Sequence, residues 1–295
     1  MNQSDLNWPK ILSDSLGVAV EKVAVQPSGG GSFGSTFRLQ TNAGTFFAKT
    51  TTDDRSTMLS SEARSLTALF QACSSLLIPR PVAARDPSDG RPGYLVMDWV
   101  RPGNATHRTF EEALGRGLAE LHGASAQQFG FECTTYCGAT PQPNPWTPTW
   151  VEFFRDSRLG ALTRRLRDRD LLTTTDIALF DRLLGRLPQL LESSEPPALI
   201  HGDLWSGNAL PAEGGEAALV DPSASYSHRE AELGMMTLFG GFSPVVYDAY
   251  HESRPLAAGW KDRNPIYQLY HVANHASLFG GGYIEDLRTR IRRFG

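Results

Sequence analysis

The chain has 295 residues and a mass of 32.3 kDa, which allows one large domain or two smaller ones. Its formal charge of -4 and isoelectric point near 6.0 argue against a nucleic-acid-binding protein, because such proteins usually carry a clear basic excess. No apolar run approaches the ~18 residues that a membrane-spanning helix needs, and the segment Met1–Asp5 lacks the cationic and apolar parts of a secretory signal, so we expect a cytoplasmic protein.

The three cysteines, Cys73, Cys133 and Cys137, are too few for a disulfide framework, and one of them would be left over. Cys133 and Cys137 lie close together in the chain, but no histidine near them completes a zinc site. We therefore predict reduced cysteines, in agreement with a reducing compartment.

The chain begins with a short predicted helix and a β-hairpin. The segment Asp5–Leu16, followed by Gly17, is typical of a helix that ends at a glycine. Two segments with strand-like patterns, Thr36–Gln40 and Thr45–Lys49, flank the turn residues Asn42–Gly44. Their spacing predicts a hairpin.

The next predicted elements are an amphipathic helix over Ser60–Cys73 and a short buried strand over Tyr94–Met97, which leads into the turn-rich segment Asp98–Gly103. Beyond it the pattern becomes helical, over Phe110–His122, Trp150–Leu162, Asp176–Leu191 and Asn264–Phe279. A β-containing front followed by a mainly helical remainder predicts an α+β fold with two lobes and a ligand in the cleft between them. Together with the glycine-rich segment at residues 29–34 and the motif at residues 201–208, it favours a two-lobed, protein-kinase-like fold. Residues 1–100 would then form the nucleotide-binding lobe and residues 101–295 the catalytic and substrate-binding lobe.

A glycine-rich segment precedes the predicted hairpin, with Gly29, Gly31 and Gly34 in the pattern G-x-G-x-x-G. Such glycines let backbone N–H groups approach phosphates, although the pattern alone is weak and also fits a surface turn. In a dinucleotide-binding fold the glycines would open a helix, and Asp53 lies where a ribose-binding acid would be expected. Because strand-like residues follow instead of a helix, we favour a kinase-type flap that includes Ser32.

Lys49 lies on the strand after this flap, and Glu62 lies near the start of the next helix. In kinases a strand lysine contacts the α- and β-phosphates and is held by a helix glutamate. A lone strand lysine is more often a solvated surface charge, but its position after the flap favours the phosphate-binding interpretation. Glu62 is the one glutamate between Lys49 and Arg80.

The most specific motif is His201-Gly202-Asp203-Leu204-Trp205-Ser206-Gly207-Asn208, which follows the apolar residues 198–200. Kinase catalytic loops place an aspartate and an asparagine five positions apart, as Asp203 and Asn208 are here. Asp203 would orient the acceptor hydroxyl and take its proton. Asn208 and Asp221, which follows a second short strand, would bind Mg²⁺. For His201 we favour a structural role that steadies the loop over a role as a base.

The acceptor is predicted to be a small molecule. Only ten residues separate Asp221 from Glu232, and no A-P-E motif follows. A protein kinase needs a longer activation segment there. Glu232 is expected to accept backbone N–H bonds beneath the catalytic loop.

Together these residues resemble the fructosamine kinase (ketosamine-3-kinase) family, whose relatives include the aminoglycoside and choline kinases. The catalytic-loop sequence with Trp205-Ser206 carries the match most specifically. Further matching stretches extend it over nearly the whole chain: Phe129–Phe131, Gly138–Asn144, Trp150–Leu159, Asp221-Pro222, His228–Leu233, Leu238–Phe242 and Tyr267–Tyr283.

The resemblance implies transfer of the ATP γ-phosphate to the 3-hydroxyl of a ketosamine, free or protein-bound, which makes the adduct labile and regenerates the amine. It also implies an adenine-binding hinge at Met97, Asp98 and Val100. Trp205 would stack on the sugar or attract the substrate ammonium, although it could instead merely pack the loop.

His275 falls where the family places a sugar-contacting histidine, although a core pair with His271 is equally open. Ser32 stands where many relatives have a cysteine, so the intermolecular disulfide known for some of them is not expected here.

Two other functions stay open at this stage. The chain could phosphorylate another amine metabolite, such as an aminoglycoside or choline, or it could be a catalytically silent ATP-binding protein. All five core positions are filled, which argues against the silent protein: Lys49, Glu62, Asp203, Asn208 and Asp221. The sequence does not reveal the oligomeric state or the preferred ketosamine.

Overall fold

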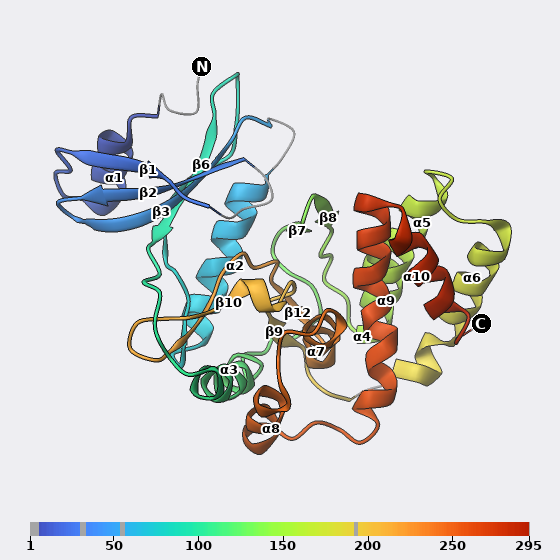
Figure 1. The fold of residues 1–295 in the computed structure, drawn as a ribbon. Helices are drawn as coiled ribbons and strands as arrows, with labels where there is room; N and C mark the ends of the chain where they lie inside the picture. The colour runs from blue at the N-terminus through green and yellow to red at the C-terminus, as the bar shows by residue number, and fades with distance from the viewer. Residues whose placement is uncertain (1–5, 30–33, 54–56, 192–193, 295) are drawn as a thin grey trace.

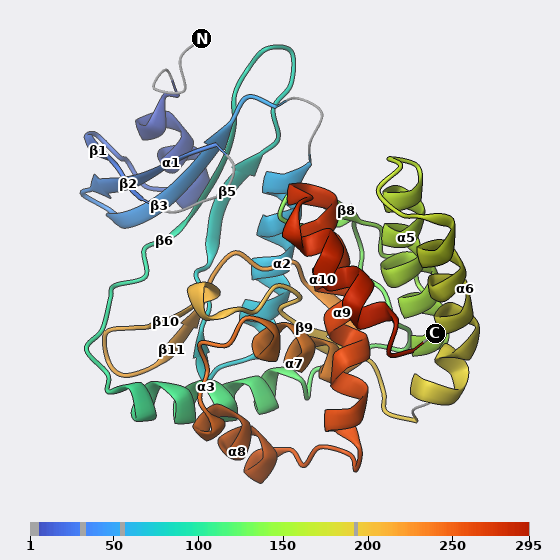
Figure 2. The same cartoon turned by 45° about the vertical axis from the view of Figure 1, so that its right-hand side comes forward.

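The computed structural model describes residues 6–29, 34–53, 57–191 and 194–294. Gly31 and Ser32 of the predicted flap lie outside these residues. Figures 1 and 2 show a β-sheet at the N-terminal end and a mainly helical region that holds the rest of the chain. This arrangement confirms the predicted α+β fold.

The N-terminal sheet has the strand order β1-β2-β3-β6-β5. Every pairing within it is antiparallel. Its strands are β1 (Val23–Pro27), β2 (Ser35–Thr41), β3 (Gly44–Thr51), β5 (Pro81–Arg85) and β6 (Gly93–Asp98). The β2–β3 hairpin pairs Thr41 with Gly44, which leaves Asn42 and Ala43 as its two-residue turn.

Two helices cover opposite faces of this sheet. Successive side chains of a strand point to opposite faces, so neighbouring residues of one strand pack against different helices. Helix α1 (Trp8–Leu16) buries Trp8 and Leu12 against one face, in a cluster that includes Ala48 and Val96. Helix α2 (Met58–Ala72) packs in another cluster with Leu95, a neighbour of Val96 on β6. Since Lys49 follows Ala48 on β3, alternation directs it to the α2 side.

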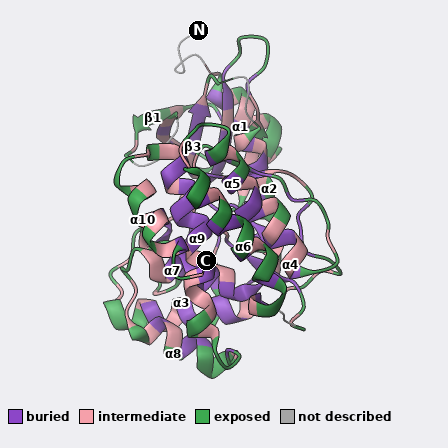
Figure 3. Cartoon of the chain, turned by 90° about the vertical axis from the view of Figure 1, so that its right-hand side faces the viewer, coloured by how far each residue is buried: buried purple, intermediate pink, exposed green. Residues whose placement is uncertain are grey.

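The remaining described residues form a helical region around the catalytic loop. Its helices are α3 (His107–Leu121), α4 (Trp150–Phe153), α5 (Gly160–Arg167), α6 (Thr174–Leu191), α7 (Arg229–Leu238), α8 (Pro244–Ser253), α9 (Trp260–Phe279) and α10 (Gly282–Ile291). Figure 3 shows that α9 is buried along much of its length, and Leu269, Val272 and Ala273 belong to the core that it shares with α5 and α6. Within the described part of the chain, no helix combines the length and apolar character needed to cross a membrane.

Short paired strands flank the catalytic loop. Strands β9 (Ala198–Ile200) and β12 (Ser225–Ser227) pair antiparallel, β10 (Ala209–Pro211) pairs antiparallel with β11 (Ala217–Leu219), and β11 pairs parallel with β4 (Leu76–Leu77). The hairpin β7 (Thr135–Cys137) and β8 (Thr140–Gln142) lies beside α9 in Figures 1 and 2. These strands bring widely separated segments together at one site.

Several helix boundaries differ from the predictions for local reasons. Helix α1 begins at Trp8 because Asn7 caps it, and Gly17 ends it with φ of 68° as predicted. The predicted helix over Trp150–Leu162 contains a π-helical segment, Phe154–Leu159. A π turn shifts the phase of the side chains, which a simple 3.6-residue pattern does not reveal.

Candidate functional site

The catalytic loop is a sharp turn that follows β9 and carries Asp203. Gly202 has φ of 84°, and a Cβ atom there would lie 2.1 Å from the carbonyl oxygen of Ser223. The amide of Ser223 donates in turn to the carbonyl of His201 at 2.8 Å. The turn therefore requires glycine at position 202.

Glu232 on α7 supports this turn from beneath, as predicted. Its buried carboxylate accepts the amides of His201 and, at 3.1 Å, of Gly202. Burial opposes its ionisation, but the neighbouring imidazoles of His122 and His201 nevertheless lower the pKa of Glu232. The loop thus rests on a buried carboxylate.

His201 has the predicted structural role. Its Nε2 donates to the carbonyl of Val220 at 2.8 Å, and its Nδ1 accepts the amide of Asp203 at 3.3 Å. Burial lowers the pKa of His201, so the ring is neutral and both nitrogens are occupied. A ring held in this way steadies the loop and is not free to act as a base.

Asp203 has the electrostatics of a general base. Burial raises its pKa to about 7, although a hydrogen bond from the Cys137 thiol, with Sγ 3.6 Å from Oδ1, acts in the opposite direction. A base works best when its pKa lies near the working pH.

Asn208 and Asp221 approach each other through backbone pairing. The amide of Val220 donates to the carbonyl of Asn208 at 3.0 Å, which brings Asp221 next to the loop. Asn208 donates its side-chain N–H to the carbonyl of Asp203 at 2.8 Å, so its side-chain oxygen stays available as a ligand. Asp221 has φ of 57°, a left-handed conformation that aspartate tolerates and that often marks functional positions.

Lys49 on β3 links helix α2 to the segment that follows β11. Its Nζ lies 2.7 Å from Glu62 Oε1 and 2.7 Å from Asp221 Oδ1. Burial opposes the charge of Lys49, but the two carboxylates raise its pKa above the usual value. The residues predicted as a phosphate-positioning pair and a metal ligand thus form one charged cluster.

Gly34, the last glycine of the predicted flap, has a constrained backbone position. Gly34 has φ of 86°, and a Cβ atom there would lie 2.0 Å from the carbonyl oxygen of Thr50, so this position requires glycine. Gly29 is exposed, and Met97 and Asp98 end strand β6, with Val100 two residues beyond it. Met97 is buried, so only its backbone could meet a ligand.

The two predicted substrate-contact residues differ in exposure, since Trp205 is exposed and His275 is partly buried. The Trp205 side chain is 43% exposed, and its ring lies over Gly207. His275 Nδ1 donates to the carbonyl of His271 at 2.8 Å, which leaves Nε2 as an acceptor. The His275 ring lies against Phe239, Phe279 and Tyr283, and Phe279 is 68% exposed.

A polar group that the sequence motifs did not assign lies on the acceptor side of Asp203. Besides Cys137 it contains His271, whose ring nitrogen lies within 4.8 Å of both partners. Asn274 donates to the carbonyl and the sulfur of Cys137, each at 3.2 Å. The π-helical segment aims the buried Arg158 at the carbonyl of Pro143, 3.0 Å away.

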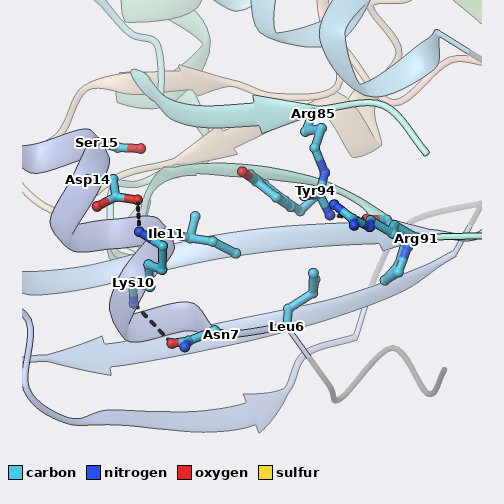
Figure 4. A pocket seen from close by; sticks show the side chains of 10 residues that line it. Leu6, Asn7, Lys10, Ile11, Asp14, Ser15, Arg85, Arg91 and Tyr94 are labelled. Carbon is cyan, nitrogen blue, oxygen red and sulfur yellow. Dashed lines mark hydrogen bonds and ion pairs between the residues drawn. The ribbon is translucent and has the colours of Figure 1, made fainter. Parts of the chain in front are cut away.

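A hollow of about 380 Å³ lies between α1 and the β5–β6 hairpin, away from the residues described above (Figure 4). Its polar groups are engaged with one another: Lys10 pairs with Asp14, and Arg85 donates to the carbonyl of Pro92 and stacks on Tyr94. None of the predicted site residues lines it. This hollow is therefore separate from the residues that the sequence predicts to be catalytic.

Comparison with known proteins agrees with this geometry. A family model described as fructosamine kinase matches residues 6–294. The chain is 38% identical over 253 residues to a probable ketoamine kinase of Synechocystis sp., covering 84% of this chain and 82% of that protein. It is 35% identical over 274 residues to a chloroplastic protein-ribulosamine 3-kinase of Arabidopsis thaliana, covering 90% and 81%.

Solved structures are similar along almost the whole chain. A candidate fructosamine-3-kinase of Thermobifida fusca superposes with a TM-score of 0.84 at 33% identity, covering 97% of each chain. The aminoglycoside phosphotransferase APH(4)-Ia superposes with a TM-score of 0.60 at 15% identity, covering 97% of this chain and 98% of the other, which shows a shared fold alone. The chain belongs to the fructosamine kinase family.

Proposed function

We propose that this protein is an ATP-dependent ketosamine 3-kinase, which transfers the γ-phosphate of ATP to the 3-hydroxyl of a sugar–amine adduct. The observation that carries the proposal is the contact of Lys49 with both Glu62 and Asp221 beside the Asp203 loop. Residues 1–100 would supply the nucleotide-binding lobe, and residues 101–295 the catalytic and substrate-binding lobe. This division follows the change from sheet to helices.

ATP would bind between the flap and the hinge. Gly29, Gly31, Ser32 and Gly34 would cover its phosphates, and the backbone of Met97, Asp98 and Val100 would receive its adenine. Lys49 would contact the α- and β-phosphates while Glu62 holds it in place. A protein of the same fold, a thermostable mutant of APH(4)-Ia, has been solved as a ternary complex with AMP-PNP and hygromycin B, which supports a nucleotide ligand.

The donor chemistry at Asn208 and Asp221 fits Mg²⁺, because both residues present oxygen ligands beside the catalytic loop. When bound there, Mg²⁺ would neutralise charge on the transferring phosphate. Asp221 is now paired with Lys49, so the lysine would shift toward the phosphates as the nucleotide binds.

On the acceptor side, Asp203 would orient the substrate hydroxyl and accept its proton. As the hydroxyl oxygen bonds to the γ-phosphorus, the bond from that phosphorus to the bridging oxygen breaks and ADP leaves. A carboxyl group with a pKa of about 7 is well suited to this proton transfer near neutral pH.

The substrate amine would lie at the aromatic mouth of the site. Trp205 and the rings around His275 offer faces that attract an ammonium group. His275 Nε2 is free to accept a hydrogen bond from a sugar hydroxyl. The location predicted from the sequence is the cytoplasm, whereas the plant relatives are described as chloroplastic.

The test is release of ADP from Mg-ATP over a panel of fructosamines, ribulosamines, aminoglycosides and choline. We expect turnover with at least one ketosamine and a phosphate on its 3-hydroxyl, located by NMR. Asp203→Asn should lower kcat by about 10²–10⁴-fold, whereas Asp181→Asn on the exposed surface of α6 should not change it. Turnover of aminoglycosides or choline but no ketosamine, or absence of any ADP release, would overturn the proposal.

A further inference from the structure

The group formed by Cys137, Asp203 and His271 has the chemistry of a metal site. Each residue offers one ligand atom, and the sulfur, the carboxylate oxygen and the imidazole nitrogen all lie within 4.8 Å of one another. They come from β7, the catalytic loop and α9. Mixed sulfur, nitrogen and oxygen ligands suit Zn²⁺ and Cd²⁺ better than Mg²⁺, which prefers oxygen alone.

We propose that these three residues bind a thiophilic divalent cation such as Zn²⁺, and that this cation inhibits the protein by capturing the Asp203 carboxylate. The site is distinct in chemistry from the Asn208–Asp221 pair, which carries no sulfur or imidazole. A cation bound to Asp203 would occupy the oxygen that must face the acceptor hydroxyl.

The unsatisfied polarity of the site is a second, independent observation. Nδ1 of His271 is buried and has no hydrogen-bond partner in the described part of the chain, and neither does Oδ1 of Asn274, whose amide contacts Cys137. The His271 side chain is only 5% exposed. Buried polar atoms normally have partners, so an unpartnered nitrogen on the His271 ring and an unpartnered oxygen on Asn274, which contacts Cys137, favour a bound species.

The geometry requires only small movements. Tetrahedral zinc, with bonds of about 2.0–2.3 Å, keeps its ligand atoms roughly 3.3–3.8 Å apart. The largest separation here is within 4.8 Å, so shifts on the order of 1 Å would close the site. Three protein ligands leave a fourth position for water, as in zinc sites that remain open.

Protons compete with the metal at this site. Burial and then the Asp203 carboxylate raise the pKa of the Cys137 thiol well above its usual value, so the free protein keeps the thiol protonated. Binding of the cation replaces this S–H bond with a metal–sulfur bond and releases the proton to solvent. Burial keeps the His271 ring neutral, the form that binds metals.

The direct test is titration of the whole, nucleotide-free protein with Cd²⁺, followed by the near-ultraviolet absorption of a cadmium–thiolate bond. We expect one equivalent to saturate the band in the unmodified protein. Cys137→Ser should abolish the band, whereas Cys73→Ser and Cys133→Ser should keep it. A band that survives Cys137→Ser, or one that disappears with either control, would overturn the proposal.

A second measurement does not depend on any variant. X-ray absorption of the unmodified protein loaded with one equivalent of Zn²⁺ should show one sulfur neighbour among nitrogen and oxygen ligands. A first shell without sulfur would refute the site even if Cys137→Ser failed to fold.

Inhibition of turnover by Zn²⁺ then distinguishes this site from the proposed magnesium site. With Mg-ATP and a ketosamine that is turned over, Cys137→Ser should raise the Zn²⁺ concentration for half-inhibition by more than about tenfold relative to Cys73→Ser. Equal inhibition of the two variants would place inhibitory zinc elsewhere and refute the inhibitory role. The cadmium band remains informative even if the proposed kinase activity is absent.

Discussion

Replacing Asp203 with asparagine should make the protein more stable while removing its base. Burial raises the folded-state pKa of Asp203 to about 7 from its usual value of 3.8. The folded protein therefore binds this proton more tightly than the unfolded chain does. As pH rises through the window between these two values, the stability contributed by the protonated carboxyl is lost, and above it the buried charge is a full penalty.

The magnitude follows from the difference between the two pKa values. This difference corresponds to roughly 4 kcal/mol at pH well above 7 and to about 2 kcal/mol near pH 5. Asparagine keeps the shape of the side chain and cannot ionise. We therefore expect the free energy of unfolding of Asp203→Asn to exceed that of the unmodified protein by an amount that grows with pH over this range.

The assay is urea unfolding of both proteins at several values between about pH 5 and about pH 8, with Asp181→Asn as a control for an exposed aspartate. The same preparation of Asp203→Asn should show the loss of turnover described above. A stability gap that stays constant or shrinks toward high pH would refute the view that Asp203 is held as a strained, poised base.

Two further substitutions test residues on the proposed nucleotide side of the site. Gly34→Ala would place a Cβ atom 2.0 Å from the carbonyl oxygen of Thr50 at a positive φ, so urea unfolding should show that the free energy of unfolding falls by about 1–3 kcal/mol. Gly29→Ala is the control, because open space surrounds Gly29, and an equal loss of stability in this variant would contradict the reasoning. Lys49→Met leaves two carboxylates without their shared cation, so we expect the free energy of unfolding to fall by about 3 kcal/mol and Mg-ATP to give no thermal stabilisation. Lys10→Met, which breaks an exposed ion pair, is the control. If Mg-ATP raised the melting temperature of Lys49→Met as much as that of the unmodified protein, a role of Lys49 in phosphate binding would be excluded.

The parts of the site that could be predicted are those encoded by short spacing. Asp203 and Asn208 belong to one loop, and Asp221 follows the strand that pairs with the loop's exit. Lys49 and Glu62 are brought together by one hairpin strand and the helix after it. In each case local elements of known geometry decide where the side chain lies.

The acceptor side could not be predicted in the same way, because its residues meet only through tertiary packing. Cys137 was expected to be a plain reduced thiol, and it is free in the structure, but its sulfur lies beside Asp203 because the β7–β8 hairpin lies along α9. Arg158 reaches inward because a π turn changes the phase of its helix. No pattern in the sequence announces that turn.

The charged residues of the site determine which ligands it would favour. Lys49 compensates Glu62 and Asp221, while Asp203 is held apart from it against a thiol. Burial raises the pKa of both Glu62 and Asp203, which is the response of carboxyl groups that lack sufficient positive charge. Such a cleft favours ligands that bring cations. Mg-ATP would bring a metal ion to Asp221, and a ketosamine would bring an ammonium group toward Trp205 and the His275 rings. Arrival of the ammonium group would help to keep Asp203 ionised and ready to accept a proton, whereas Mg-ATP as a whole is anionic and would bind through the cation at Asp221 and the charge of Lys49.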